Sequence, residues 1–193
     1  MGHIVSGESS METAPSDNLL VSAARKGDRE AFTALVRRYQ AAVHAFVLSR
    51  VGDFDAADDL AQETFVAAFV GLDDLREPER FGGWLRGIAA NLSAAWLRRR
   101  TREAARMEAV PDAALEAASA REASPEDALL QREREAAALT ALSRLTPKRA
   151  AAVALFYADG LSYAECAQFL NVPVSTIEGR LHKARRQLQE EVL

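Results

Sequence analysis

Residues 162 to 188 read SYAECAQFLNVPVSTIEGRLHKARRQL, and this stretch predicts two short helices joined by a tight turn. Each helix begins with the pattern Ser-x-x-Glu, in which a hydroxyl and a carboxylate satisfy amide groups that open a helix. The two pairs are Ser162 with Glu165 and Ser175 with Glu178. Pro173 lies between them and interrupts the helical pattern, because proline has no amide donor. The stretch therefore predicts a helix-turn-helix.

The second helix of this stretch has an apolar face and a polar face. The apolar face repeats at the spacing of a helix that packs on a core. It contains Ile177, Leu181, Ala184 and Leu188. The polar face has small residues near its start and cations further along, which suits a helix that enters a DNA major groove and pairs with phosphates. It contains Ser175, Gly179, His182 and Arg186, flanked by Arg180, Lys183 and Gln187. A solvated basic face on an ordinary helical hairpin is the alternative.

Composition limits the class of protein. The chain has 193 residues, 49% of them hydrophobic, which suffices for the core of one domain or of two small ones. No apolar run approaches the roughly 20 residues of a membrane span, and the N-terminus lacks a signal pattern. We therefore expect a soluble, cytoplasmic protein with no direct membrane insertion. The single cysteine, Cys166, is predicted to be a buried packing residue, with a redox sensor as the alternative.

Charge is unevenly distributed along the chain. The formal net charge is -4, but residues 1 to 18 carry -3 and residues 107 to 128 carry -5. The remaining residues carry +4, which is only mildly basic and does not predict strong DNA binding by the chain alone. Residues 1 to 18 are polar and unpatterned, so we expect a disordered tail, in which Met11 is an alternative start. Residues 107 to 128 contain Pro111 and Pro125 and few large apolar side chains, which predicts a linker.

Two helices are predicted after the N-terminal tail. Asp17 or Asn18 is placed to cap a short helix that Gly27 closes, and Asp28 is placed to cap a longer helix that ends at Gly52. The longer helix has a single apolar stripe, so both helices are expected to build a core. The stripe consists of Phe32, Leu35, Val36, Tyr39, Val43, Phe46 and Val47.

The next predicted helix starts at Asp53 and is acidic on one face. Asp59, Gln62 and Glu63 form a compact polar patch there, beside Phe65. Two interpretations of the patch remain open. The helix dipole stabilises acidic residues in the N-terminal half of a helix, which is a sufficient structural reason for them. The same patch also suits docking on a basic partner.

Residues 81 to 106 predict the most informative helix after the helix-turn-helix. Its core side is expected to contain Phe81, Trp84, Leu85, Ile88, Leu92, Ala95 and Trp96. An adjacent stripe and the helix end combine small residues, an amide and arginines, which contact single-stranded nucleic acid through stacking and phosphate pairing. The stripe is Gly87, Asn91, Ala94 and Arg98, and the helix ends in Arg98, Arg99, Arg100, Arg102 and Arg106. The alternative is that cations cap the helix C-terminus, which explains two or three arginines better than five.

The rest of the chain adds helices but no catalytic pattern. Helical spacing resumes at Leu129, breaks at Pro147 and continues to Gly160. The three histidines are too scattered for a metal site, and no nucleophile and base are spaced for recognisable catalysis. We therefore predict no metal, no cofactor and no enzymatic activity.

Three motifs in order make the chain resemble bacterial RNA polymerase sigma factors of the extracytoplasmic-function (ECF) group of the sigma-70 family. The motifs are DAADDLAQETF from Asp55, FGGWLRGIAANLSAAWLRRRTR from Phe81 and LSYAECAQFLNVPVSTIEGRLHKAR from Leu161. The resemblance implies an all-α fold of two small helical domains joined by a flexible linker, the C-terminal one a helix-turn-helix. The expected parts are a disordered tail at 1–18, a region 2 type domain at 19–106, a linker at 107–128 and a region 4 type domain at 129–193.

The resemblance also implies which residues act. Asp59, Gln62 and Glu63 fall where such proteins dock on the clamp of the largest subunit of core RNA polymerase, which favours the docking interpretation of the patch. For reading and melting the promoter minus-ten element, the implied residues are Trp84, Gly87, Asn91, Ala94, Arg98 and Arg99. For reading the minus-thirty-five element of promoter DNA, they are Ser175, Thr176, Gly179, Arg180, His182, Lys183 and Arg186. An anti-sigma factor partner is expected from the family alone.

The sequence also departs from the family pattern. Ala90 and Ala95 stand where relatives usually have Arg and Asp, so two polar contacts are missing. Glu178 and Gly179 stand where a basic residue and Ser are common. The alternative from another class is a stand-alone helix-turn-helix DNA-binding transcriptional regulator with an N-terminal helical dimerisation or sensing domain. Such a regulator would bind DNA tightly without polymerase and would have no use for the acidic patch.

Overall fold

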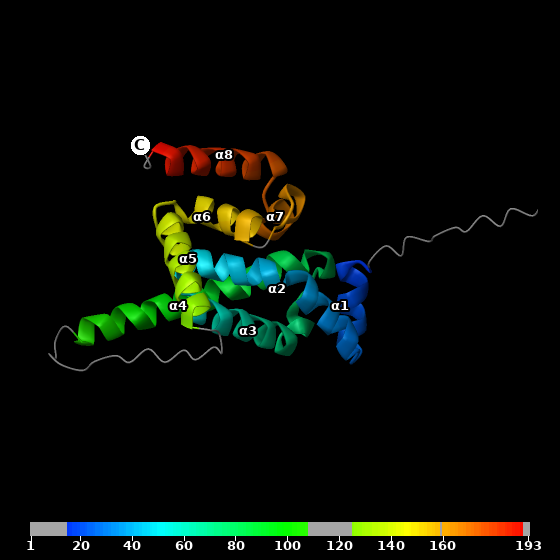
Figure 1. The fold of residues 1–193 in the computed structure, drawn as a ribbon. Helices are drawn as coiled ribbons and strands as arrows, with labels where there is room; N and C mark the ends of the chain where they lie inside the picture. Colours follow the sequence, from blue (N-terminus) through cyan, green and yellow to red (C-terminus); the bar gives the residue numbers. More distant parts are fainter. Residues whose placement is uncertain (1–14, 108–124, 159, 191–193) are drawn as a thin grey trace, which may run out of the picture.

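The computed structural model describes residues 15 to 107, 125 to 158 and 160 to 190. Every regular element within these ranges is helical, which confirms the all-α fold class. Figure 1 shows two groups of helices, one from α1 to α4 and one from α5 to α8. None of the described helices is both long enough and apolar enough to cross a membrane.

The first group is built around α2 (Arg29–Val51). The other elements are α1 (Asp17–Arg25), α3 (Phe54–Val70), α4 (Phe81–Met107) and the short 3₁₀ turns η1 (Leu72–Asp74) and η2 (Pro78–Arg80). α2 contacts α1, α3 and α4, and its Leu35, Val43 and Val47 side chains are fully buried. The predicted apolar stripe of α2 is therefore the centre of this group, and its removal from water stabilises the packing.

The ends of α2 and α3 lie where the sequence predicts them. The Asp28 carboxylate accepts hydrogen bonds from two amides in the first turn of α2. Gly52 ends α2 in the left-handed conformation, at φ 65°, which glycine adopts without a steric penalty. The Asp53 carboxylate accepts a hydrogen bond from the Ala56 amide at 3.0 Å and so caps α3. These ends are fixed by residues adjacent in the sequence.

The predicted cap of α1 is wrong. Ser16 occupies the cap position without a side-chain hydrogen bond, and Asp17 lies in the first turn of the helix. The Asp17 carboxylate is 8% exposed and accepts hydrogen bonds from the Arg38 guanidinium and the Tyr39 hydroxyl of α2. This contact between helices occupies the carboxylate and overrides the local capping signal. Residues 1 to 14 of the predicted tail lie outside the described residues.

The second group begins earlier than predicted. It consists of α5 (Pro125–Ser143), α6 (Pro147–Val153), the π-helical turn η3 (Ala154–Ala158), α7 (Tyr163–Leu170) and α8 (Val174–Glu190). The predicted linker runs to residue 128, but α5 starts at Pro125. Proline is favoured at the first position of a helix, because its fixed φ suits the helix and its missing amide would have no partner there. Residues 108 to 124 of the predicted linker lie outside the described residues.

The first capping box of the helix-turn-helix is confirmed. The Glu165 amide donates to the Ser162 hydroxyl at 3.2 Å, and the Ser162 amide donates to the Glu165 carboxylate at 2.8 Å. The Ser162 hydroxyl also donates to the Glu165 carboxylate at 2.6 Å. This bond, followed by the bond from the Ser162 amide, lowers the pKa of the Glu165 carboxyl. Asn171 ends α7 in the left-handed conformation, at φ 51°. The first helix therefore ends before Pro173, as the sequence predicts.

The second predicted capping box is wrong. α8 begins at Val174, so Ser175 lies inside the first turn rather than before it. The carbonyl of Pro173 accepts a hydrogen bond from the Thr176 amide at 2.9 Å. Because proline has no amide to satisfy, a helix can begin directly after it without a side-chain cap. Ser175 is therefore not the cap of α8.

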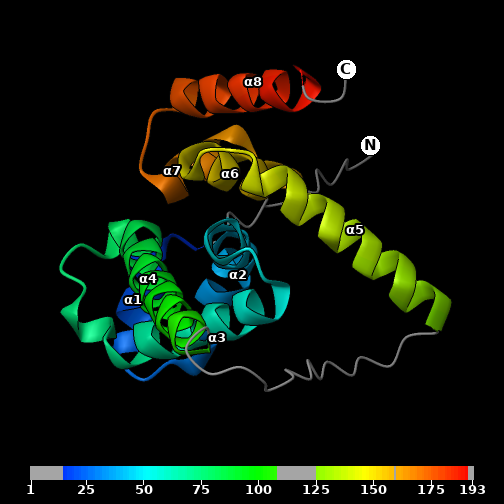
Figure 2. The ribbon, with the colours of Figure 1, turned by 90° about the vertical axis from the view of Figure 1, so that its left-hand side faces the viewer.

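The two groups pack on each other. Phe169 of α7 is 2% exposed, and its ring centroid lies 6.0 Å from that of Phe46 and 6.4 Å from that of Tyr39, both on α2. One cluster of buried side chains continues from α1 to α8. α2 also contacts α6 and η3, and Figure 2 shows α6 and α7 lying over α2. The sequence did not predict this shared core, because apolar spacing shows that a face is buried but not what covers it.

Cys166 lies within the shared core. Its side chain is fully buried, which confirms the prediction of a packing residue. Burial, and to a lesser extent the neighbouring Glu165 charge, raises the pKa of the Cys166 thiol to about 11. The thiolate is the reactive form of cysteine, so this environment does not favour a redox sensor.

Candidate nucleic-acid interface

α3 presents an acidic patch to solvent. Its buried side consists of Ala57, Leu60, Ala61, Thr64 and Ala68. Asp59, Gln62 and Glu63 lie on the opposite side and are exposed, so the structure brings these three predicted residues together. Further along α3 the exposed side chains are apolar, with Val66 65% exposed and Val70 80% exposed. A partner on this face would meet acidic charge at one end and apolar surface at the other.

A groove of about 800 Å³ lies between the acidic patch and the C-terminal half of α4. Asp59 and Glu63 line it from α3, whereas Trp96, Arg99 and Arg102 line it from α4. The α4 wall also contains Arg106 and Glu103, so it is basic on balance, whereas the α3 wall is acidic. The surface predicted to bind protein adjoins the surface predicted to bind DNA, which the sequence alone did not indicate.

The buried side of α4 differs in detail from the prediction. Its fully buried residues lie one turn apart and are Phe81, Leu85, Ala89 and Ser93. The Ser93 hydroxyl donates to the Ala89 carbonyl at 2.7 Å, so this buried polar group is satisfied. Ala95 was expected on the core side but is exposed. Two residues correspond to about 200° of helical rotation, which turns Ala95 away from the side that Ser93 occupies.

The predicted minus-ten residues follow one side of α4. Asn91, Arg98 and Arg99 are exposed, whereas Trp84, Gly87 and Ala94 are half-buried. A Cβ atom built on Gly87 would have no atom within 4 Å, so a ligand can approach the helix backbone there. The stripe is thus accessible along its length, with cations at its C-terminal end.

The C-terminal arginines of α4 have more than one role. The Arg100 guanidinium lies 5.0 Å from the Trp96 ring centroid and 3.6 Å from the Asp53 carboxylate. Arg99 lies 3.8 Å from Glu103 in an exposed pair, which contributes little to stability. The remaining exposed arginines extend the positive charge to the end of the helix and are Arg98, Arg102 and Arg106. Arg100 therefore contacts side chains of its own group of helices, which neither the nucleic-acid interpretation nor the capping alternative anticipated.

A second groove, of about 910 Å³, lies at the start of α4. The α3 to α4 loop lines one side with Arg76 and Arg80, α4 contributes Trp84 and Arg86, and the turn between α7 and α8 lines the other side. Among the described residues, Arg86 Nε is a buried donor that has no hydrogen-bond partner. Sequence reasoning missed these three arginines, although their closeness to the start of the predicted helix at 81 was a usable signal.

α8 separates its core face from its polar face as predicted. Ile177, Leu181 and Ala184 are 0%, 1% and 0% exposed. On the other side, the exposed residues among those predicted are Ser175, Gly179, His182, Lys183 and Arg186, and the half-buried ones are Thr176 and Arg180. A Cβ atom built on Gly179 would have no atom within 4 Å. The N-terminal half of this face is therefore smooth and open, as close approach to DNA requires.

Other polar residues of α8 hold the helix in place. Gln187 accepts a hydrogen bond from Arg149 at 2.7 Å and donates one to the Arg144 carbonyl at 2.6 Å. Arg185 Nε donates to the Tyr157 hydroxyl at 2.6 Å, and this bond raises the pKa of Arg185. Gln187, which the sequence placed beside the polar face, is therefore a structural residue that fixes the angle of α8.

These surfaces have the chemistry of binding. Within the described ranges, no group of three or more His, Cys, Asp or Glu side chains could hold a metal ion. The exposed residues among those predicted on α4 and α8 carry guanidinium, ammonium, amide, imidazole and hydroxyl groups. Such groups pair with phosphates, read base edges and stack on bases.

Family models match both groups of helices. The model described as Sigma-70 region 2 matches residues 35–103, and the model described as Sigma-70, region 4 matches residues 135–188. The two matches cover most of α2 to α4 and most of the second group from the middle of α5, so they include the predicted residues of α3, α4 and α8.

Relatives match over nearly the full length. The chain is 29% identical over 181 residues to the ECF RNA polymerase sigma factor SigW of Bacillus subtilis, covering 87% of this chain and 92% of the relative. It is 32% identical over 180 residues to the ECF RNA polymerase sigma-E factor of Escherichia coli K12, covering 91% and 94%.

Two solved structures are similar in fold. The structure of CnrH in complex with the cytosolic domain of CnrY has a TM-score of 0.58 and 28% identity, covering 92% of this chain and 97% of that chain. The sigma factor RpoE in complex with the anti-sigma factor NepR, from Bartonella quintana, has a TM-score of 0.51 and 27% identity, covering 83% and 96%.

Proposed function

The chain belongs to the ECF sigma factors of the sigma-70 family, and from this premise we propose that it binds core RNA polymerase, recognises promoter minus-thirty-five and minus-ten elements and promotes DNA melting. In this proposal the chain performs no covalent chemistry of its own. It supplies three binding surfaces, one each on α3, α4 and α8.

The acidic patch of α3 is proposed to contact polymerase. Asp59 and Glu63 would pair with a basic surface on the clamp of the largest subunit, and Gln62 between them would supply hydrogen bonds. Such a partner fits the formal net charge of -4, because an acidic protein is attracted to a basic protein surface and repelled by free DNA.

α4 is proposed to recognise and melt the minus-ten element. Trp84 offers a ring edge and Asn91 an amide to unstacked bases, while Arg98 and Arg99 pair with phosphates. Gly87 and Ala94 have little or no side chain, so the DNA strand can approach the backbone of α4 on this side. Capture of unstacked bases offsets part of the free energy that opening the duplex costs.

α8 is proposed to read the minus-thirty-five element in the major groove. Ser175 and Gly179 are small, so the start of the helix can approach base edges. Thr176, Arg180 and His182 would contact bases in the same major groove of the DNA. Lys183 and Arg186, one to two turns further, would pair with phosphates.

The observation that carries the proposal is the groove between α3 and α4, whose walls have opposite charge. A stand-alone DNA-binding regulator would gain nothing from acidic side chains beside the cations that contact its DNA, because they repel phosphates. A protein that binds polymerase and DNA side by side uses both walls.

An anti-sigma factor partner is also proposed. RpoE of Bartonella quintana is bound to the anti-sigma factor NepR in its solved structure, and that sigma factor shares the fold of this chain. By analogy, the α3, α4 and α8 surfaces would be covered when such a partner binds.

Transcription with purified core polymerase tests the proposal. Wild type is compared with Asp59→Ala/Gln62→Ala/Glu63→Ala on templates with a randomised upstream region, and binding to core polymerase is measured in parallel. The triple variant is expected to lose both core binding and transcripts. The matched control is Glu30→Ala/Glu133→Ala, which removes the same charge from exposed acids elsewhere and is expected to behave as wild type.

One outcome of this experiment would contradict the proposed function. If the wild type binds duplex DNA tightly without polymerase and the triple variant still supports its activity, the sigma function is wrong for this chain. The stand-alone regulator would then be the better description.

A further inference from the structure

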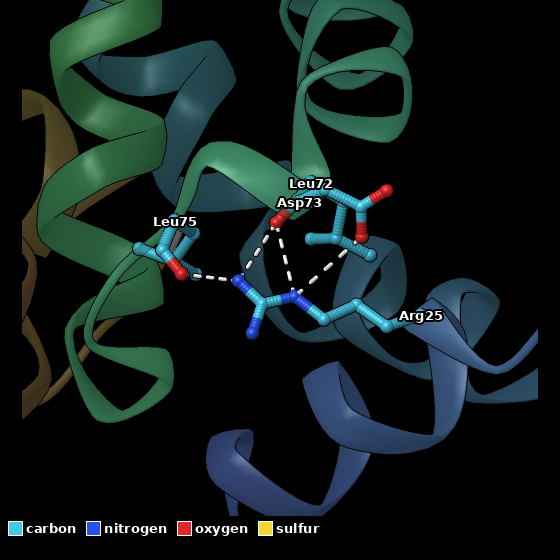
Figure 3. A network of polar contacts seen from close by, with 4 residues as sticks. All are labelled: Arg25, Leu72, Asp73 and Leu75. Atoms are coloured by element: carbon cyan, nitrogen blue, oxygen red, sulfur yellow. Dashed lines mark hydrogen bonds and ion pairs between the residues drawn. The ribbon is translucent and has the colours of Figure 1, made fainter.

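Arg25 connects α1 to the loop between α3 and α4. Its Nε donates to the Leu72 carbonyl at 3.2 Å, and its Nη2 donates to the same carbonyl at 2.9 Å. Nη2 also donates to the Leu75 carbonyl. Figure 3 shows the guanidinium lying between the two carbonyls, with the Asp73 carboxylate nearby. One side chain thus holds both ends of the η1 turn.

The bonds to the carbonyls matter more than the ion pair. The Asp73 side chain is 91% exposed and 3.9 Å from Arg25 Nε, so water screens this contact. The Arg25 side chain is only 26% exposed, and Leu72 and Leu75 are each 4% exposed. Two kinds of contact therefore fix the loop. The Leu72 and Leu75 side chains pack in the core, and their carbonyls accept hydrogen bonds from Arg25. α1 also contacts η1 and η2, which places the whole loop against this helix.

The loop in turn supports the start of α4. Gly71, at the beginning of the loop, lies so close to Trp84 that an added Cβ atom would be 3.8 Å from Trp84 Cζ2. Further along, Arg76 and Arg80 line the groove of about 910 Å³ together with Trp84 and Arg86. The loop also lines it with Asp74, Glu77 and Glu79, and Arg80 pairs with Glu77 at 2.8 Å. The position of the loop therefore sets the distance between Arg76 and the Trp84 ring.

We propose that Arg25 is a positioning residue for minus-ten recognition. By bridging the Leu72 and Leu75 carbonyls, it fixes the α3 to α4 loop so that Arg76 and Trp84 hold a melted strand in one geometry. Arg25 does not itself contact DNA in this proposal. The inference rests on the proposed function, because it deepens the role given to the start of α4.

The geometry requires arginine rather than lysine. A guanidinium is planar and presents several N–H donors in a fixed fork, so it can donate to two carbonyls from one position. An ammonium is a point charge on a flexible stem and is more strongly hydrated. Lysine would keep the charge and lose the bridge, which makes Arg25→Lys an informative variant.

The experiment compares full-length wild type, Arg25→Lys and Arg25→Met in holoenzyme with core polymerase. The matched control is Lys26→Met, which removes an exposed cation from the next position. Templates with a randomised upstream region are transcribed, and sequencing of the transcribed templates gives the base preference at each promoter position. Core binding, open-complex formation and thermal unfolding are measured on the same proteins.

Both Arg25 variants are expected to form open complexes roughly tenfold more slowly and to show weaker base preference in the minus-ten element only. Their core binding and minus-thirty-five preference should match those of wild type. If Arg25→Lys equals wild type, or if base preference is unchanged, Arg25 does not position the loop. If wild type itself supports no initiation, the proposed function fails, and the Arg25 inference fails with it for that separate reason.

Discussion

Two helices of the molecule, α7 in the second group and α1 in the first, depend on polar contacts of different range. In the helix-turn-helix, the polar contacts that define α7 join residues three apart, as in the capping box of Ser162 and Glu165. In the first group, Asp17 bonds to Tyr39 across 22 residues, and Arg25 bonds to the Leu72 carbonyl across 47. The comparison teaches that one helix can be specified by its sequence neighbours, whereas another is fixed by tertiary contacts. α8 is of the second kind, since Gln187 bonds to Arg149 and to the Arg144 carbonyl.

The largest expected effect concerns the contact between the groups. Phe169→Ala is expected to lower the free energy of unfolding by about 3 to 5 kcal/mol, because it leaves a cavity beside Tyr39 and Phe46. Both tryptophans, Trp84 and Trp96, lie in the first group. Urea unfolding followed by tryptophan fluorescence therefore reports on the group that does not contain the substitution.

The fluorescence midpoint should shift with the midpoint measured by far-ultraviolet circular dichroism. Val174→Ala serves as the control, since this residue is 42% exposed and its loss should change little. A fluorescence midpoint that stays at the wild-type value would mean that the two groups unfold independently and that the shared core contributes no coupling.

A smaller effect tests the long-range polar contacts. Tyr39→Phe removes the hydrogen bond to Asp17 and is expected to cost about 1 to 2 kcal/mol at neutral pH. Burial, followed by the Asp17 carboxylate, raises the pKa of Tyr39 well above its usual range. The contribution of Tyr39 to the free energy of unfolding is therefore complete below about pH 10. Above that pH it falls, because the tyrosine ionises in the unfolded chain while it stays protonated in the folded protein.

Phenylalanine cannot ionise, so the stability advantage of wild type over Tyr39→Phe should shrink as the pH rises past about 10. Urea unfolding of both proteins at pH 8 and at pH 11 measures this change. Parallel pH profiles would show that the Tyr39 hydroxyl is not held in a buried site, and the first group would then depend less on long-range polar contacts than the structure indicates.

The smallest expected effect tests local specification. Ser162→Ala removes the capping box and should lower the free energy of unfolding by about 1 kcal/mol, whereas Ser175→Ala should change it by less than about 0.5 kcal/mol. The two substitutions have the same chemistry in the same motif, so each is the control for the other. Equal losses in thermal or urea unfolding would contradict the assignment of only one functional cap.

Much of the fold could be predicted because helix ends are often set by neighbouring residues. Asp28, Gly52 and Asp53 act on amides or backbone conformations within a few positions, and their patterns are visible in the sequence. Asp17 has the same local signal, yet its carboxylate bonds to another helix. Local patterns could not separate these cases, since they contain no information about distant donors.

The candidate site was predictable to a similar extent. Helical spacing placed Asp59, Gln62 and Glu63 on one exposed face, and the structure agrees. The role of Arg25 had no sequence signal, because its acceptors are backbone carbonyls, which every residue possesses. The same reasoning explains why the charged groove between α3 and α4 was not foreseen, since it depends on how two helices pack.

The shared core also limits how freely the two halves can be exchanged in evolution. Tyr39 and Phe46 belong to the first group but form the surface on which Phe169 of the second group rests. A helix-turn-helix transplanted from a relative would have to bring an aromatic ring of similar shape at that position. Modules that look interchangeable in the linear order of the chain are therefore expected to be inherited together, with coupled substitutions on α2 and α7.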